Sequence, residues 1–201
     1  PAHWPPLARA LAQAWDDFDG FVLLHGTDTM AWTASALSFL LRGADKPVIV
    51  TGSQIPLLQP RSDAPAHLLA ALDLAAHHRV PEVGLLFGRH LWRGNRARKL
   101  HSHDFDAFGS PNALPLADLG IDLVVHQHRL LAPGPLRFVA PDLRPDSVAV
   151  LTLYPGVDGR AVDALLDATG ARALLLQTYG AGNAPEGGGL PLPSSLPDWL
   201  G

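Results

Sequence analysis

The pentapeptide HGTDT at 25–29 holds the residue types in this chain that could carry out chemistry. It follows the apolar run 21–24 and precedes an apolar-periodic segment that begins at Met30. This order predicts a strand, a tight glycine turn and a helix, so a hydroxyl and a carboxylate lie where open α/β sheets bind their ligands. A threonine can act as a nucleophile and an aspartate can anchor an ammonium group. The alternative is that Thr27 and Asp28 only cap the following helix, a position that both residue types favour.

A second group of polar residues is expected at the same sheet edge. Residues 88–112 are predicted to form a long polar loop after an apolar strand, and the basic run in this loop ends at Lys99. An uncharged lysine amine can accept the proton of the Thr27 hydroxyl while Asp28 holds the amine in place. The alternative is a basic loop that is simply solvated.

Apolar segments and turn residues predict the elements that position these side chains. We expect strands at 21–25, 48–51 and 83–87 and helices at 7–15, 30–41 and from 62 or 63 to about 78. Gly43 is expected to cap the second helix, and Ser62 or Asp63 the third. The β-α-β-α-β order with continuously apolar strands predicts an α/β fold, with a parallel sheet covered by helices on both faces.

The domain organisation is predicted from proline content and a second β-α-β pattern. Residues 1–130 are expected to form a large N-terminal α/β domain that lacks its first strand. The proline-rich stretch 131–146 is predicted to be a linker, and 147–201 the beginning of a second, smaller α/β domain. The start at Pro1 and the final Gly/Pro tract indicate a fragment truncated at both ends.

Composition excludes several classes of protein. Hydrophobic residues make up 47% and charged residues 17% of the chain, which is typical of a globular protein with an ample core. A net charge of −4 offers no electrostatic footprint for nucleic acid. No apolar run approaches the ~20 residues needed to span a bilayer. The absence of cysteine excludes disulfides and thiolate metal sites and fits a reducing compartment. We therefore expect neither a nucleic-acid partner nor a membrane partner.

Histidine pairs and a glycine motif are the remaining candidates for metal or cofactor binding. His101 and His103, and likewise His126 and His128, could ligate a metal in pairs, but no third ligand is well placed in the sequence. The sequence Gly-Ala-Gly at 180–182 resembles half of a dinucleotide fingerprint without its third glycine or its helix. We predict no metal site and no cofactor.

Several segments together resemble the bacterial-type L-asparaginase family, in particular its cytoplasmic type I branch. The resemblance runs from about residue 4 to 185, and HGTDTM followed in order by the RGNR, Lys and FDAF.SPN block is highly specific. The matching segments are DGFVLLHGTDTMAWTASALSFLL (19–41), KPVIVTGSQIPL (46–57), RSDA (61–64), LWRGNRARKLHSHDFDAFGSPN (91–112), LTLYPG (151–156) and QTYGAGNAP (177–185).

The resemblance implies hydrolysis of L-asparagine to L-aspartate and ammonia, with L-glutamine as a possible slower substrate. It also implies a cytoplasmic homodimer or homotetramer. Thr27 and Lys99 would form the hydroxyl–amine pair that activates the attacking group, and Asp28 would bind the substrate α-ammonium. Main-chain donors near Gly26 and Thr27 would face the developing oxyanion. Asn183 resembles a family residue near the active site or an effector site.

The sequence also departs from the family pattern. The family's other essential threonine, in a T-G-G-T turn, and its segment that binds the substrate α-carboxylate have no counterpart among these residues. We therefore expect the isolated 201 residues to be weakly active or inactive, and which threonine attacks first stays open. Two alternatives remain, a non-catalytic amino-acid-binding module and the amidase subunit of a tRNA-dependent amidotransferase.

Overall fold

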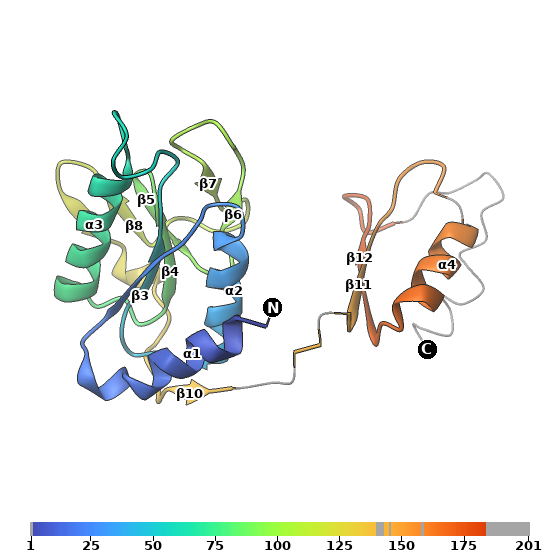
Figure 1. Ribbon diagram of the computed structural model, residues 1–201, viewed down its shortest axis with the longest axis horizontal. Coiled ribbons are helices and arrows are strands. Elements are labelled where there is room, and N and C mark those ends of the chain that lie inside the picture. The colour runs from blue at the N-terminus through green and yellow to red at the C-terminus, as the bar shows by residue number, and fades with distance from the viewer. Residues whose placement is uncertain (1, 140–142, 145, 158, 184–201) are drawn as a thin grey trace. The chain divides into compact units, whose positions relative to one another are not determined.

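The computed structural model describes residues 2–139, 143–144, 146–157 and 159–183, which form two compact units (Figure 1). Of the described residues, the larger unit contains 3–139, and the smaller one contains Ala2 and the residues from 143 onward. Among the described residues, no helix is long and apolar enough to cross a membrane.

A six-stranded mixed sheet forms the centre of the larger unit. The predicted strands β1 (Phe21–Leu24), β3 (Val48–Thr51) and β4 (Val83–Phe87) pair in parallel. The sheet then continues antiparallel through β5 (His90–Arg93), β8 (Ala117–Leu119) and β9 (Leu123–Val125), in the order β1-β3-β4-β5-β8-β9. The α/β class is confirmed, but the expectation of a purely parallel sheet is wrong for this second half.

The change of direction occurs at a two-residue turn. Phe87 of β4 pairs with His90 of β5, so only Gly88 and Arg89 connect the two strands. Gly88 has φ +59°, in the left-handed region that glycine adopts without steric cost and that tight hairpins require. The prediction of a continuous polar loop over 88–112 is therefore wrong. That stretch contains β5 and a short hairpin of β6 (Arg98–Lys99) with β7 (Phe108–Gly109).

Helices cover both faces of the sheet, as the sequence predicted (Figure 1). Helices α1 (Trp4–Gln13) and α2 (Met30–Leu40) share a core cluster with Val48 and Val50 of β3. On the other face, α3 (Ala64–His77) packs in a cluster that includes Ile49 of the same strand. Successive side chains of a strand point to opposite faces, so one short strand contributes to both cores. Each fully buried Val, Ile or Leu side chain there stabilises the fold by about 1.5–3 kcal/mol.

The segment after α2 differs from the expected helix cap at Gly43. Helix α2 ends at Leu40, and β2 (Leu41–Arg42) pairs antiparallel with β10 (Arg137–Phe138). Gly43 has φ +74°, and a Cβ on it would lie 2.4 Å from the Pro135 carbonyl oxygen. Glycine is needed there because two backbone segments approach closely, and not because a helix ends there. Part of the proline-rich stretch 131–146 is thus a strand of the larger unit.

The smaller unit contains the second β-α-β pattern that the sequence predicted. Strands β11 (Val148–Thr152) and β12 (Ala173–Gln177) pair in parallel, and α4 (Gly159–Thr169) connects them. The cluster that α4 covers includes Leu151 and Leu166. The other described elements of the chain are the short 3-10 helices η1 (Trp15–Asp17) and η2 (Gln127–Arg129), both in the larger unit.

Candidate active site

Thr27 and Asp28 lie between the end of β1 and the start of α2. The parallel pairing of β1 with β3 extends one step further, because the His25 N–H donates to the Thr51 carbonyl at 2.8 Å. Helix α2 begins at Met30 with Thr29 at its N-cap, and no side chain there makes a capping hydrogen bond. The alternative in which Thr27 and Asp28 only cap the helix is therefore wrong.

Lys99 reaches both of these side chains from the β6–β7 hairpin. Its Nζ donates to Thr27 Oγ1 at 2.8 Å and to Asp28 Oδ1 at 2.7 Å. The Lys99 side chain is 20% exposed, whereas that of Asp28 is 94% exposed. The hairpin places Lys99 opposite Phe108, whose ring packs against Phe87 of β4. The structure thus brings Lys99 to two residues that lie 71 and 72 positions earlier in the chain, and Lys99 is not part of a merely solvated loop.

The ionic contact changes the acid–base properties of Asp28. The hydrogen bond from Lys99, followed by the positive charge of the same amine, holds the pKa of the Asp28 carboxyl below its ordinary value of 3.8. At neutral pH Asp28 is therefore an anion with one oxygen on Lys99 and most of its surface open to solvent.

A directional chain of hydrogen bonds fixes the turn that carries Thr27. Trp4 Nε1 donates to Thr33 Oγ1 at 3.1 Å, Thr33 Oγ1 lies 2.9 Å from His25 Nε2, and His25 Nδ1 lies 2.7 Å from the Gly26 carbonyl oxygen. A carbonyl can only accept, so His25 Nδ1 carries a proton. In a trans peptide the carbonyl and the next N–H point in opposite directions, and no cis peptide is present in the described chain. The Thr27 N–H is therefore directed away from the His25 ring.

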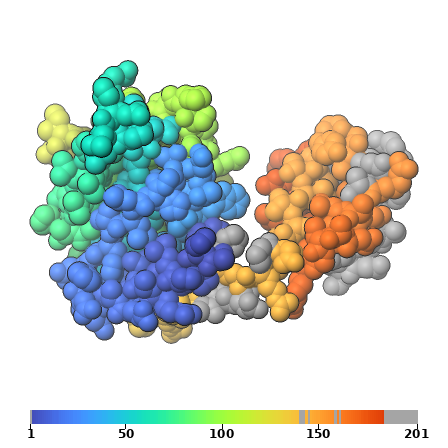
Figure 2. Space-filling view, viewed as in Figure 1, coloured from blue at the N-terminus to red at the C-terminus, as the bar shows by residue number. Residues whose placement is uncertain are grey.

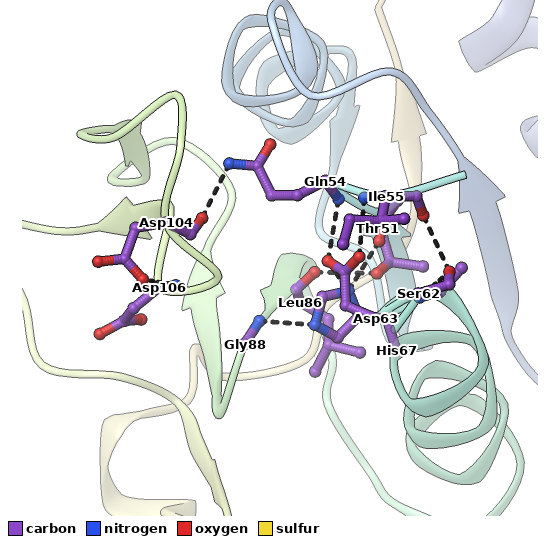
Figure 3. Close-up of polar contacts among 12 residues, drawn as sticks. Thr51, Gln54, Ile55, Ser62, Asp63, His67, Leu86, Gly88, Asp104 and Asp106 are labelled. Atoms are coloured by element: carbon purple, nitrogen blue, oxygen red, sulfur yellow. Dashed lines mark hydrogen bonds and ion pairs between the residues drawn. The ribbon is translucent and has the colours of Figure 1, made fainter. Parts of the chain in front are cut away.

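The loop after β3 is fastened beside the site. Both oxygens of Asp63 accept main-chain N–H groups, from Gln54 and Ile55, each at 2.9 Å (Figure 3). Asp63 occupies the N-cap position of α3, as one of the two expectations had it, but its carboxylate binds this loop and makes no capping hydrogen bond. Ser62 lies one residue before the N-cap position, and its Oγ accepts the Ala64 N–H at 3.1 Å.

The loop that follows β3 also contacts the hairpin that carries Lys99. Gln54 Nε2 donates to the carbonyl oxygens of Ser102 and Asp104, at 3.2 and 2.8 Å. In the space-filling view these two loop segments, teal and yellow-green, project at the same end of the larger unit (Figure 2). The two loops therefore support one another at the carboxyl ends of the parallel strands.

Two further predicted residues have different settings. A Cβ on Gly26 would meet nothing within 4 Å, so the main chain there is open to an approaching molecule. Asn183 belongs to the smaller unit, where its side chain is exposed and its carbonyl accepts the Tyr179 N–H at 3.1 Å. A role of Asn183 in substrate binding stays a prediction.

One member of the predicted histidine pairs, His126, bonds a carboxylate together with His90. His126 Nε2 and His90 Nδ1 contact the two oxygens of Asp118, at 2.7 and 2.8 Å. The hydrogen bond from His126 is the main cause of a lowered pKa at Asp118. Within the part of the chain that the structure describes, no three His, Cys, Asp or Glu residues are grouped so that they could hold a metal ion.

Sequence reasoning missed two histidines near the site, the ring of His25 described above and that of His67. His67 is only 5% exposed, and it shares the buried face of α3 with Ala71 and Leu74. A histidine at helical spacing with buried apolar residues was the available signal, because a buried polar ring needs hydrogen-bond partners.

Comparison with known proteins is decisive for the family. The model described as "Asparaginase, N-terminal" matches residues 1–131, which is more than half of the chain. The chain belongs to the asparaginase family. L-asparaginase 1 of Escherichia coli K12 is 47% identical over 190 residues, covering 92% of this chain and 55% of that protein.

Two other relatives extend this comparison. The crystal structure of L-asparaginase I from Vibrio cholerae superposes with a TM-score of 0.85 at 45% identity, covering 93% of this chain and 57% of that one. A glutamyl-tRNA(Gln) amidotransferase subunit of Thermococcus kodakarensis is 34% identical over 197 residues, covering 92% of this chain and 44% of that protein. The chain thus spans about half the length of the curated relatives it matches.

Proposed function

We propose that the complete protein hydrolyses L-asparagine to L-aspartate and ammonia. The observation that carries this proposal is the 2.8 Å contact between Lys99 Nζ and Thr27 Oγ1, with Asp28 on the same amine. A hydroxyl in hydrogen-bond contact with a potential base, which a third group orients in turn, is the arrangement of an activated nucleophile. The L-asparaginase names of the Escherichia coli and Vibrio cholerae relatives support the same reaction.

In the proposed mechanism, the Lys99 ammonium first loses a proton to solvent, and the uncharged amine then takes one through its contact with Thr27. The attacking oxygen, that of Thr27 or of a water held by it, then adds to the side-chain amide carbon of the substrate. The C–N bond breaks, the proton passes to the departing nitrogen, and ammonia leaves. Where Thr27 has attacked, water then hydrolyses the resulting ester, which releases L-aspartate and restores the Thr27 hydroxyl. Where water has attacked, its oxygen enters the new carboxylate directly.

Charge that develops on the substrate carbonyl oxygen needs a donor, and the Thr27 main chain is placed to provide one. Its N–H is directed away from His25 and lies just before the first turn of α2, where unpaired N–H groups and the helix dipole favour negative charge. The open main chain at Gly26 gives a substrate carbonyl room to approach this donor. Pre-aligned donors of this kind are often the largest single term in catalysis of acyl transfer.

Asp28 is proposed to bind the substrate α-ammonium. Its carboxylate is ionised at neutral pH, and its 94% exposure leaves it accessible while Lys99 holds Oδ1. The further proposals are slower action on L-glutamine, a contribution of Asn183 to substrate or effector binding, assembly as a homodimer or homotetramer, and a cytoplasmic location. They rest on the family resemblance and on the absence of cysteine.

Ammonia release from millimolar L-asparagine by the complete polypeptide tests this proposal. Thr27→Ala should abolish the release. The matched control is Thr169→Ala, because that hydroxyl bonds only the Leu166 carbonyl and the Ala171 N–H at the end of α4, and the control should retain the rate. Equal rates for Thr27→Ala and the unmodified protein would contradict the mechanism. Saturable asparagine binding without ammonia would favour the binding module, and co-purification with tRNA and a partner chain would favour the amidotransferase subunit.

A further inference from the structure

The His67 side chain connects two loops that the proposed active site depends on. Its Nδ1 lies 2.8 Å from the carbonyl oxygen of Gly52, in the loop after β3. Its Nε2 lies 2.9 Å from the main-chain nitrogen of Gly88, in the turn after β4 (Figure 3). The ring therefore joins the carboxyl ends of two neighbouring parallel strands from the helix that packs on them.

These contacts determine the protonation state of the ring. A carbonyl can only accept a hydrogen bond and a main-chain N–H can only donate one. His67 must therefore carry its proton on Nδ1 and present the lone pair of Nε2 to Gly88. Asp63 Oδ2 lies 3.6 Å from the protonated Nδ1, on the side that favours this tautomer. A proton on Nε2 would instead point at the Gly88 N–H, so that two hydrogen-bond donors would face each other in a buried place.

One end of this connection leads to the turn of Thr27. A Cβ on Gly52 would lie 2.1 Å from the His25 carbonyl oxygen, so the backbone of Gly52 packs directly against that of His25. His25 is two residues before Thr27, and its ring holds the Gly26 carbonyl. The hydrogen bond from His67 to Gly52 therefore restrains the segment on which the Thr27 turn rests.

The other end leads to Lys99 through packed aromatic rings. The centroid of the His67 ring is 4.5 Å from that of Phe87, which is 4.8 Å from that of Phe108. Phe108 is the partner of Lys99 in the β6–β7 hairpin. Gly88 also lies against this hairpin, since a Cβ on it would be 3.4 Å from the Phe105 carbonyl oxygen.

We propose that His67 is a positioning residue of the active site, which sets the separation of Lys99 Nζ from Thr27 Oγ1 by holding Gly52 and Gly88 together. The proposal rests on the proposed function and assigns it a residue that touches neither the substrate nor the reacting atoms. Misplacement of a reacting group by about 1 Å costs roughly 100-fold in rate, so a connection of this kind affects turnover directly.

Two substitutions separate positioning from a merely structural role. His67→Leu removes both hydrogen bonds, whereas His67→Gln keeps a donor and an acceptor at the end of a side chain of similar reach. The matched control is His77→Leu on the same helix, because the His77 side chain is 73% exposed and bonds only Asp73. Each variant is made in the complete protein, with steady-state kinetics, thermal unfolding and NMR titration of the Asp28 carboxyl.

In His67→Leu, kcat should fall about 10- to 100-fold with little change in KM, because Asp28 still binds the substrate. The pKa of Asp28 should rise toward its ordinary value, because Lys99 no longer bonds it as closely. His67→Gln should recover most of both effects, and His77→Leu should cause neither. Nitrogen NMR of the unmodified protein should show His67 protonated at Nδ1 alone.

Two results would overturn the proposal. One is a His67→Leu protein that unfolds at a lower temperature but keeps its kcat and its Asp28 pKa. The other is an Nε2–H or doubly protonated His67 ring in the folded protein at neutral pH. The Asp28 titration and the ring spectrum need no turnover. Absence of ammonia release by the unmodified protein would therefore count against the proposed function and leave this test intact.

Discussion

Two ion pairs lie at opposite ends of the parallel strands, and they are built differently. Glu82, just before β4, is 4% exposed, and its carboxylate accepts Arg93 Nε at 2.5 Å, Arg93 Nη2 at 3.1 Å and the Leu131 N–H at 2.9 Å. Arg93 Nη2 also donates to the Arg129 carbonyl. Asp28, after β1, is 94% exposed and has one oxygen on Lys99.

From this difference we infer a structural role for the Glu82 pair and a functional role for the Asp28 pair. The Glu82 carboxylate accepts all three of these hydrogen bonds from the protein itself, and its burial leaves little of it open to a ligand. The Asp28 carboxylate is almost entirely open, and an exposed pair of this type contributes little to stability. The same basic run supplies both cations, since Arg93 and Lys99 are six residues apart. The two carboxylates carry the same charge, and what distinguishes them is how many of their hydrogen bonds the protein itself supplies.

The largest expected effect concerns the functional pair. Thr27→Ala and Lys99→Met should each lower kcat by about 10³- to 10⁶-fold, and the double variant should be hardly worse than either, because members of one catalytic unit are not additive. Initial rates of ammonia release from saturating L-asparagine measure this. Multiplicative losses in the double variant would show that the two side chains act independently.

The structural pair should govern stability instead. Glu82→Gln leaves the Arg93 guanidinium poorly compensated in a partly buried place, and we expect the free energy of unfolding to fall by about 3–5 kcal/mol. Urea denaturation measures this change. Asp28→Asn is the matched carboxylate-to-amide control and should leave the urea midpoint unmoved. Similar losses in the two variants would remove the distinction between the pairs.

Substitutions at Gly52 and Gly26 allow a tightly packed and an open position at the same sheet edge to be compared. Gly52→Ala forces a methyl group to within 2.1 Å of the His25 carbonyl oxygen, so we expect a loss of about 1–3 kcal/mol in stability. Gly26→Ala meets no atom within 4 Å and should change the thermal midpoint little. Thermal unfolding of the two variants side by side tests this. A stable Gly52→Ala protein would show that the loop after β3 is not packed as described.

The smallest expected effect is the pH dependence from Asp118. Its folded pKa lies below the ordinary value of 3.8, chiefly because His126 bonds it. This contribution to stability is therefore present above pH ~4 and is lost as the pH falls through the folded pKa. Its size should be below about 1 kcal/mol, because the side chain is 44% exposed. Asp118→Asn should flatten this part of the stability curve between about pH 5 and 2, and an unchanged curve would contradict the assignment.

The sequence was sufficient for the parts of the fold that depend on local pattern. Continuous apolar runs at β1, β3 and β4 identified strands buried on both faces, and the intervening periodic segments identified the helices. The position of HGTDT after β1 then placed Thr27 and Asp28 at the ligand-binding edge, and Lys99 was expected at the same edge.

The remainder depends on contacts that local pattern does not encode. The short strand β5 has the sequence HLWR, with only two apolar residues, and only the Gly-Arg pair before it signalled a hairpin. Asp63 precedes a helix, yet its carboxylate binds two N–H groups of a loop. Capping the helix and binding the loop need the same acceptor oxygens, so the local sequence does not show which of the two occurs. The proposed role of His67 depends on Gly52 and Gly88 lying close together in the fold, and this follows only from the pairing of β3 with β4.

We expect the Asp28–Lys99 pair to serve chemistry and the Glu82–Arg93 pair to serve stability, and two methionine variants separate these roles. Lys99→Met and Arg93→Met would each be measured for kcat with L-asparagine and for the urea midpoint in the complete protein. We predict that Lys99→Met loses turnover and keeps its midpoint, while Arg93→Met loses its midpoint and keeps the kcat of the folded fraction. A Lys99→Met protein that still turns over asparagine, or an Arg93→Met protein of unchanged stability, would contradict the account.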